Sequence, residues 1–74
     1  MLFRSRLAQV DDVMLDEEEQ RLFGALDDRS PQHVDELSLR TGIPVSVALT
    51  KLTELELKGL ATQRPGKYFL RRIS

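Results

Sequence analysis

The chain has 74 residues, a formal net charge of −1, 41% hydrophobic residues and 31% charged residues. This length and composition are typical of one globular domain and exclude a disordered chain. Because cysteine is absent, disulfides and thiolate metal sites are excluded, and a reducing, cytoplasmic compartment is favoured. No apolar run approaches the roughly 20 residues of a membrane span, so we expect no membrane contact.

Charge is distributed unevenly along the chain. Residues 16–30 contain six acids and two arginines, a net charge of −4, whereas residues 60–74 contain four cations and no acid, a net charge of +4. The sequence therefore predicts an acidic end and a basic end. The basic segment either contacts a polyanion or keeps an edge strand soluble. Its four cations are Arg64, Lys67, Arg71 and Arg72.

Residues 1–15 allow two interpretations. Apolar residues recur there at helical spacing, which indicates an extra amphipathic helix that packs on this domain or on a second copy. The alternative is a linker that precedes the domain. The residues of this apolar stripe are Phe3, Leu7, Val10 and Met14.

The next helix has a clear start signal. Asp16 and Glu19 form a capping-box pattern, and the run of three glutamates at 17–19 favours the positive end of a helix. Apolar residues then recur at helical spacing as far as Leu26. We expect a helix over residues 16–27, with the glutamates forming either a solvated face or an acidic docking surface.

A short helix is expected between two turn signals. Residues 32–34 suit a short extended segment, and Asp35 is the expected N-cap of a helix that ends at Thr41. Gly42 then supplies the left-handed residue that stops this helix.

A longer helix should run from Pro44 to Lys58. Proline suits the start of a helix, and Gly59 supplies the residue that ends it. The stripe that this helix is expected to bury consists of Val45, Ala48, Leu49, Leu52 and Leu55.

The period of the pattern changes after this helix. Two extended runs flank a Pro-Gly pair at 65–66, which fits a type II turn. Alternation along the second run places Tyr68 and Leu70 on one face, which we expect to be buried. Phe69 and Arg71 then lie on the opposite, exposed face.

The order of these elements predicts a mainly α fold with a small β-hairpin. Helix, short strand, helix, tight turn, helix and hairpin together make a winged helix-turn-helix, with three helices plus a wing, over residues 16–74. The expected core residues are Leu37, Ile43, Leu49, Leu52, Leu55, Leu60 and Tyr68.

The run "VDELSLRTGIPVSVALTKLTELELKGL", followed by "RPGKY", resembles the C-terminal winged-helix domain of the DprA family, the bacterial DNA-processing proteins of natural transformation. The resemblance spans about residues 16–72. It implies a parent protein whose Rossmann-like core binds single-stranded DNA and helps load RecA. No Gly-rich phosphate loop and no doubly wound sheet fit into these residues, so we expect an appended accessory module. The matching residues are Asp35, Glu36, Leu37, Thr41, Gly42, 52–57, Gly59, Leu60, Pro65, Gly66 and Tyr68.

Two departures from the family pattern favour a protein contact. The family starts the longer helix with serine and places glutamate three residues later, whereas this chain has Pro44 and Val47. Val47 thereby becomes a candidate exposed apolar residue, and Phe69 stands at a wing position where a polar residue is expected. The candidate protein-interaction residues are Val47, Phe69, Phe3 and Leu7.

The wing is the better candidate for DNA than the helix. The outward face of the longer helix offers no Arg, Asn or Gln for bidentate base contacts, so we expect no base-specific reading. The wing cations can neutralise phosphates, and an exposed aromatic ring can stack on an unpaired base. The candidate nucleic-acid-binding residues are Arg64, Lys67, Phe69, Arg71, Arg72 and Lys51.

Catalysis, metals and cofactors are not expected. His33 is the only histidine, and no second ligand stands near it in the sequence. No nucleophile, base and orienting group can be assembled from the scattered serines and threonines. We therefore expect a non-enzymatic module with two alternative roles. It binds DNA weakly and without sequence preference through the wing, or it docks on the core of its parent, a partner or a second copy.

Overall fold

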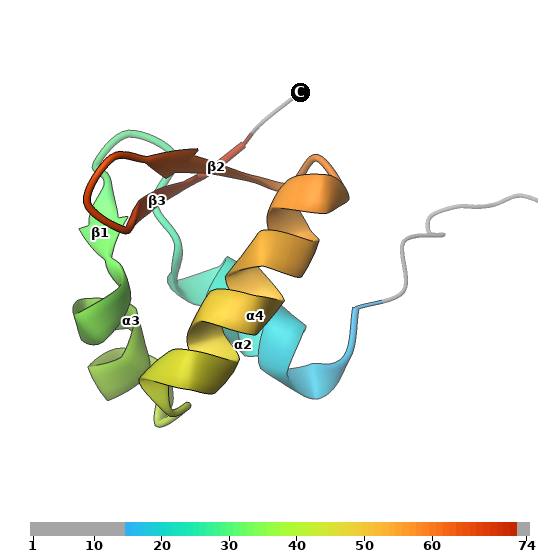
Figure 1. Ribbon diagram of the computed structural model, residues 1–74. Helices are drawn as coiled ribbons and strands as arrows, with labels where there is room; N and C mark the ends of the chain where they lie inside the picture. The colour runs from blue at the N-terminus through green and yellow to red at the C-terminus, as the bar shows by residue number, and fades with distance from the viewer. Residues whose placement is uncertain (1–14, 73–74) are drawn as a thin grey trace, which may run out of the picture.

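The structure is a computed structural model that describes residues 15–72. Within this range the chain forms three helices and one three-stranded antiparallel sheet, which confirms the expected winged helix (Figure 1). No helix in this part of the chain is long and apolar enough to cross a membrane. The elements in chain order are α2 (Glu17–Ala25), β1 (Gln32–His33), α3 (Val34–Thr41), α4 (Val45–Leu57), β2 (Ala61–Arg64) and β3 (Tyr68–Arg71).

Helix α2 begins with the expected capping box. The backbone N–H of Glu19 donates to the Asp16 carboxylate at 2.8 Å, and the Asp16 N–H donates to the Glu19 carboxylate at 3.0 Å. Two N–H groups that lack partners within the helix are thereby satisfied. The helix ends at Ala25, slightly before the expected residue 27, because Leu26 adopts an extended conformation.

The start of α3 differs from the prediction. The N-cap is His33 and not Asp35, because His33 ends β1 in an extended conformation and the helix follows directly. The Nδ1 atom of His33 accepts a hydrogen bond from the Asp35 N–H at 3.0 Å, as a cap oxygen would. At the other end, Gly42 has φ +75°, which confirms the left-handed stop.

Helix α4 carries most of the expected buried stripe. Ala48, Leu52 and Leu55 are fully buried, and Leu49 packs partly buried against the same core. Val45 is 39% exposed, so its assignment to the stripe is wrong. It lies in the first turn of α4, and the buried positions of the helix begin only at Ala48.

The wing is a three-stranded sheet with β3 at its centre. Strand order is β1-β3-β2, so the short extended segment expected at 32–34 becomes the third strand by pairing with β3. Arg64 pairs with Tyr68 across the hairpin, which leaves a three-residue turn. Gly66 has φ +86°, the conformation that a type II turn requires of its third residue.

The structure buries a different aromatic residue of β3 from the one that the sequence predicts. Phe69 is fully buried and Tyr68 is 41% exposed, so the expectations of a core Tyr68 and an exposed Phe69 are both wrong. The phenyl ring has no polar atom and is buried without penalty, whereas the tyrosine hydroxyl remains within reach of water. Leu70 is nearly buried, as expected.

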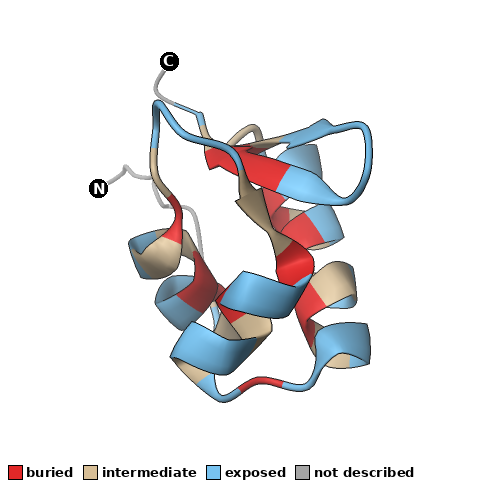
Figure 2. Cartoon of the chain, turned by 90° about the vertical axis from the view of Figure 1, so that its left-hand side faces the viewer, coloured by how far each residue is buried: buried red, intermediate tan, exposed pale blue. Residues whose placement is uncertain are grey.

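The core lies between the three helices and the inner face of the sheet, where the buried segments meet (Figure 2). Leu37, Ile43, Leu52 and Leu55 are buried as predicted, and Leu60 packs partly buried against them. The core cluster consists of Leu22, Leu26, Val34, Leu37, Ile43, Ala48, Leu52, Leu55, Ala61 and Phe69.

Candidate nucleic-acid interface

Two cations lie at the tip of the wing. Arg64 is the last residue of β2 and Lys67 belongs to the turn, and both are exposed. Neither forms an ion pair with any residue between 15 and 72. Lys67 adopts φ +66°, a conformation that few residues other than glycine adopt, and its carbonyl accepts the Val34 N–H at 3.0 Å. The turn that presents these cations is therefore held to the start of α3.

A hollow opens beside these cations. It has a volume of about 350 Å³ and is lined by Pro31, Arg64, Pro65 and Tyr68. The Tyr68 ring meets the His33 ring edge to face, with 5.1 Å between ring centroids. Gly66 passes so close that a Cβ atom there would lie 3.4 Å from the Tyr68 ring. Contacts with His33 and the turn thus fix an aromatic ring that is still 41% exposed.

Arg72 lies at the other end of the wing. It is exposed, and its backbone N–H donates to the Leu60 carbonyl at 2.9 Å. It is four positions after Tyr68, which corresponds to roughly 13 Å along a strand. A single bound strand of nucleic acid could contact both ends of the wing only by following β3.

Arg71 holds the wing to α2 and is not a free cation. Its Nη2 atom donates to the Phe23 carbonyl at 3.0 Å, and the guanidinium lies 4.6 Å from the centre of the Phe23 ring. Its backbone N–H donates to the Asp27 carbonyl at 2.8 Å. The expectation of an outward Arg71 is therefore wrong, because its guanidinium contacts Phe23 within the fold. Its binding to phosphate stays a prediction, which this contact does not favour.

Lys51 is also committed to contacts within the domain. Its Nζ atom lies 2.6 Å from the Asp16 carboxylate, 3.8 Å from Glu54 and 4.0 Å from Glu18. The hydrogen bond to Asp16 raises the pKa of Lys51, and the same bond lowers the pKa of Asp16. Its expected place among the nucleic-acid-binding residues is not supported, since three carboxylates already surround the ammonium group.

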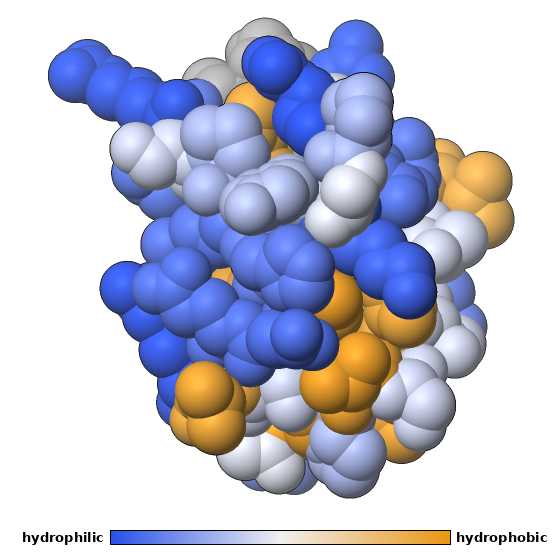
Figure 3. Space-filling view, turned by 60° about the vertical axis from the view of Figure 1, so that its left-hand side comes forward, coloured by the Kyte–Doolittle hydropathy of each residue, from blue (hydrophilic) through white to orange (hydrophobic). Residues whose placement is uncertain are grey.

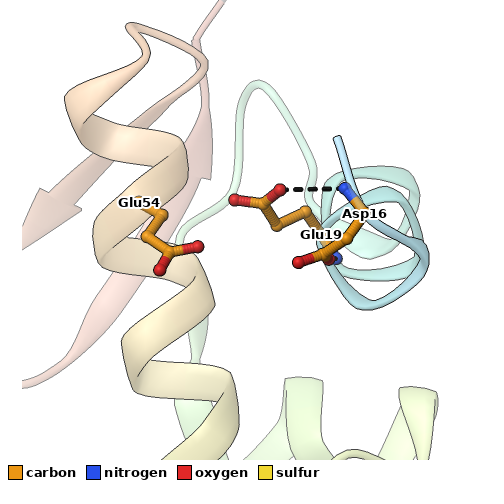
Figure 4. Close-up of side chains that lie close together, drawn as sticks. All are labelled: Asp16, Glu19 and Glu54. Carbon is orange, nitrogen blue, oxygen red and sulfur yellow. Dashed lines mark hydrogen bonds between the residues drawn. The ribbon is translucent and has the colours of Figure 1, made fainter. Parts of the chain in front are cut away.

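The acids of this network gather between α2 and α4. Figure 4 shows Asp16 and Glu19 facing Glu54 across the gap, and one carboxylate oxygen of each lies within 4.8 Å of the others. Such a group can hold a metal ion, but the ammonium groups of Lys51 and Lys58 already supply positive charge here. The arrangement acts as an electrostatic link between the two helices.

Glu19 is the buried member of this link, with 2% of its surface exposed. Burial raises the pKa of its carboxyl group, but hydrogen bonds from the Asp16 N–H and from Lys58 outweigh this effect. The net result is a lowered pKa. The Lys58 ammonium lies 3.0 Å from both carboxylate oxygens, so the buried charge is compensated from two sides.

The outward face of α4 offers little for reading bases. Ser46, Thr50 and Thr53 are exposed there, but the threonine hydroxyls donate to carbonyls of their own helix, at 3.2 Å and 2.8 Å. Helix α4 has no side-chain cap and no acid in its first turn.

The residues expected to form a protein contact are not grouped at the surface. Val47 packs partly buried against the core, Phe69 is buried, and Phe3 and Leu7 lie outside the described residues. Among residues 15–72, the most exposed aliphatic side chains are instead Leu39 and Leu57, at 86% and 82% exposure. Each stands two positions after a buried leucine and so lies on the opposite side of its helix, about 200° around the axis. The two-residue spacing from a buried leucine is the sequence signal that could have identified Leu39 and Leu57 as exposed.

Hydrophobic side chains reach the visible surface in separate patches rather than one continuous area, with hydrophilic groups between them (Figure 3). Three helices and a small wing with an exposed basic tip define a winged-helix domain. The family model of the DprA winged helix domain matches residues 8–67, and the chain belongs to this family. The searches of curated proteins and of solved structures found no significant match.

Proposed function

We propose that this domain is a non-enzymatic accessory module of a DprA-like protein that binds nucleic acid weakly, and without sequence preference, through the tip of its wing. The observation that carries the proposal is the pair Arg64 and Lys67, two exposed cations without acidic partners in the described chain. The other cations of the candidate site, Lys51 and Arg71, are occupied within the fold. Arg72 adds a third exposed charge at the far end of the wing.

The strength of such binding follows from the number of free cations. Contacts to phosphate release counterions, with a salt slope of about −0.9 per contact on duplex DNA and about −0.7 on single strands. Two or three contacts therefore give a slope between about −1.4 and −2.7. The dissociation constant at physiological salt should be no better than about 10⁻⁴–10⁻⁶ M, as for other non-specific complexes.

The absence of catalysis is part of the same proposal. Within the described residues, His33 uses its Nδ1 atom to cap α3 and packs its ring on Tyr68. The threonine hydroxyls at 41, 50 and 53 donate to helix carbonyls. These groups are engaged in contacts within the fold and do not form a set of nucleophile, base and orienting group in residues 15–72.

The test compares the loss of two wing cations with a change of one charge elsewhere in the domain. Arg64→Gln combined with Lys67→Gln should reduce affinity for a labelled oligonucleotide at least tenfold at low salt and flatten the salt slope. Gln20→Glu on the exposed face of α2 lowers net charge without touching the wing, and it should leave affinity within about twofold. An unchanged affinity in the double variant would rule out the wing tip as the binding site.

Self-association is a second candidate function, and the exposed leucines favour it. Leu39 and Leu57 each leave more than four-fifths of their surface in water, which is unusual for leucine on a small domain. If they contact a second copy, the wild-type chain should form dimers in sedimentation experiments. Leu39→Ser or Leu57→Ser should then yield monomers while the helical circular dichroism stays unchanged. A wild-type monomer at all concentrations would exclude this role.

A further inference from the structure

The hollow beside Tyr68 has the features of a site for a flat ring. Tyr68 supplies an exposed aromatic surface, and Pro31 and Pro65 add apolar walls from two different loops. The Tyr68 ring is already fixed by His33 and by the close passage of Gly66. A ring that is ordered before binding loses little conformational freedom when a ligand stacks on it.

The charge around the hollow selects an anionic ligand. Arg64 lines the hollow and Lys67 immediately precedes Tyr68, whereas no acidic side chain of residues 15–72 lines it. Asp35 is directed to His33, from which its carboxylate lies 3.6 Å away, at the start of α3. A nucleotide is a ligand of this kind, because its base is planar and its phosphate carries the negative charge beside the ring.

We infer that this hollow binds one unpaired base of a single-stranded nucleic acid, with the base stacked on Tyr68 and an adjacent phosphate on Arg64 or Lys67. This inference rests on the proposed function and adds a preference for single strands. The bases of a duplex are paired and stacked on each other, so they cannot enter the hollow. The unpaired bases of a single strand can stack on an exposed aromatic side chain. It also assigns the stacking role to Tyr68, since Phe69 is in the core.

The chain supplies its own probe for this contact. Tyr68 is the only tyrosine and there is no tryptophan, so the tyrosine emission of the full chain reports on this one ring. Addition of an oligothymidylate of about twelve nucleotides, within the range of single-strand site sizes, should quench this emission. An oligomer of the same length built from abasic nucleotides carries the same phosphates without bases and should not. Free N-acetyltyrosinamide in parallel samples corrects for light absorbed by the bases.

Variants separate stacking from charge. Tyr68→Ala should weaken binding of a labelled oligothymidylate about 5- to 150-fold at low salt, while affinity for the abasic oligomer stays within twofold. Tyr68→Phe keeps the ring and should keep affinity within about threefold. Pro31→Ala removes one wall of the hollow without altering a strand, so it provides a second variant if Tyr68→Ala changes the circular dichroism. It should give a smaller loss in the same direction.

Each outcome decides between the two proposals. If thymidylate and abasic oligomers bind equally and Tyr68→Ala affects neither, the inference is overturned, and sensitivity to the Arg64 and Lys67 changes would leave the proposed function standing. If the wild-type chain binds neither oligomer at low salt, both proposals fail. Quenching by a proline-rich peptide without any response to thymidylate would assign the hollow to a peptide and overturn the inference.

Discussion

The burial of Phe69 leads to a prediction that opposes the one made from sequence. An exposed Phe69 would be a contact residue whose replacement leaves the fold intact. In the structure it is fully buried in the central strand of the sheet and belongs to the core cluster. Phe69→Ala should therefore unfold the domain rather than affect a surface.

The magnitude follows from the ring that is lost. A phenylalanine buries about 150–250 Å² of surface, and at roughly 25 cal/mol per Å² this corresponds to about 4–6 kcal/mol. Measured replacements of buried phenylalanine by alanine cost about 3–5 kcal/mol. A domain of this size rarely has more than about 3–5 kcal/mol of stability in total. The variant should therefore be largely unfolded at 25 °C.

Urea denaturation followed by circular dichroism measures this effect. The wild-type chain should show a folded baseline, and Phe69→Ala should show little or none. Tyr68→Ala is the matched control, because it removes a ring of similar size that is 41% exposed and should therefore cost clearly less than Phe69→Ala. If Phe69→Ala unfolds like the wild type while Tyr68→Ala is strongly destabilised, the wing faces the opposite way and the reasoning is refuted.

Three further predictions concern the acidic cluster between α2 and α4, the contact of Arg71 with α2, and the outward face of α4. The pKa values of Asp16 and Glu19 are lowered in the folded chain, so their stabilising contribution is present at neutral pH and is lost as the pH falls below their ordinary values of 3.8 and 4.5. Urea midpoints at pH 7 and pH 3 should show this loss, and Glu19→Gln should reduce the difference between them. Arg71→Met should lower the urea midpoint, because the bond to the Phe23 carbonyl disappears; an unchanged midpoint would mean that this contact contributes nothing. Thr50→Ala should leave DNA affinity within about threefold, and a tenfold loss on one duplex sequence only would show that α4 reads bases.

Features set by neighbouring residues were predictable from the sequence. The capping box at Asp16 and the left-handed Gly42 depend on residues within a few positions of each other, and both are present. The buried positions of α4 from Ala48 onward follow from helical spacing alone. Local chemistry therefore indicated the order of the elements and most of the core.

Features set by distant contacts were not predictable in the same way. Alternation along β3 shows that Tyr68 and Phe69 lie on opposite faces, but the face that meets the helices is decided by packing. The Phe23 carbonyl that binds Arg71 and the Asp16 carboxylate that binds Lys51 are each more than 30 residues away in the chain. The sequence near Lys51 offers only Glu54 as a partner, and the sequence near Arg71 offers no acid, so both cations were included in the candidate site.

The electrostatic link between α2 and α4 also determines how the module can be tethered. Asp16 is held by Lys51 and by its capping box, which fixes the direction of the backbone where it enters the domain. In Figure 1 this entry point lies on the side of the fold away from the turn between β2 and β3. A tether that enters the domain at residue 15 therefore joins it on the side opposite the wing tip.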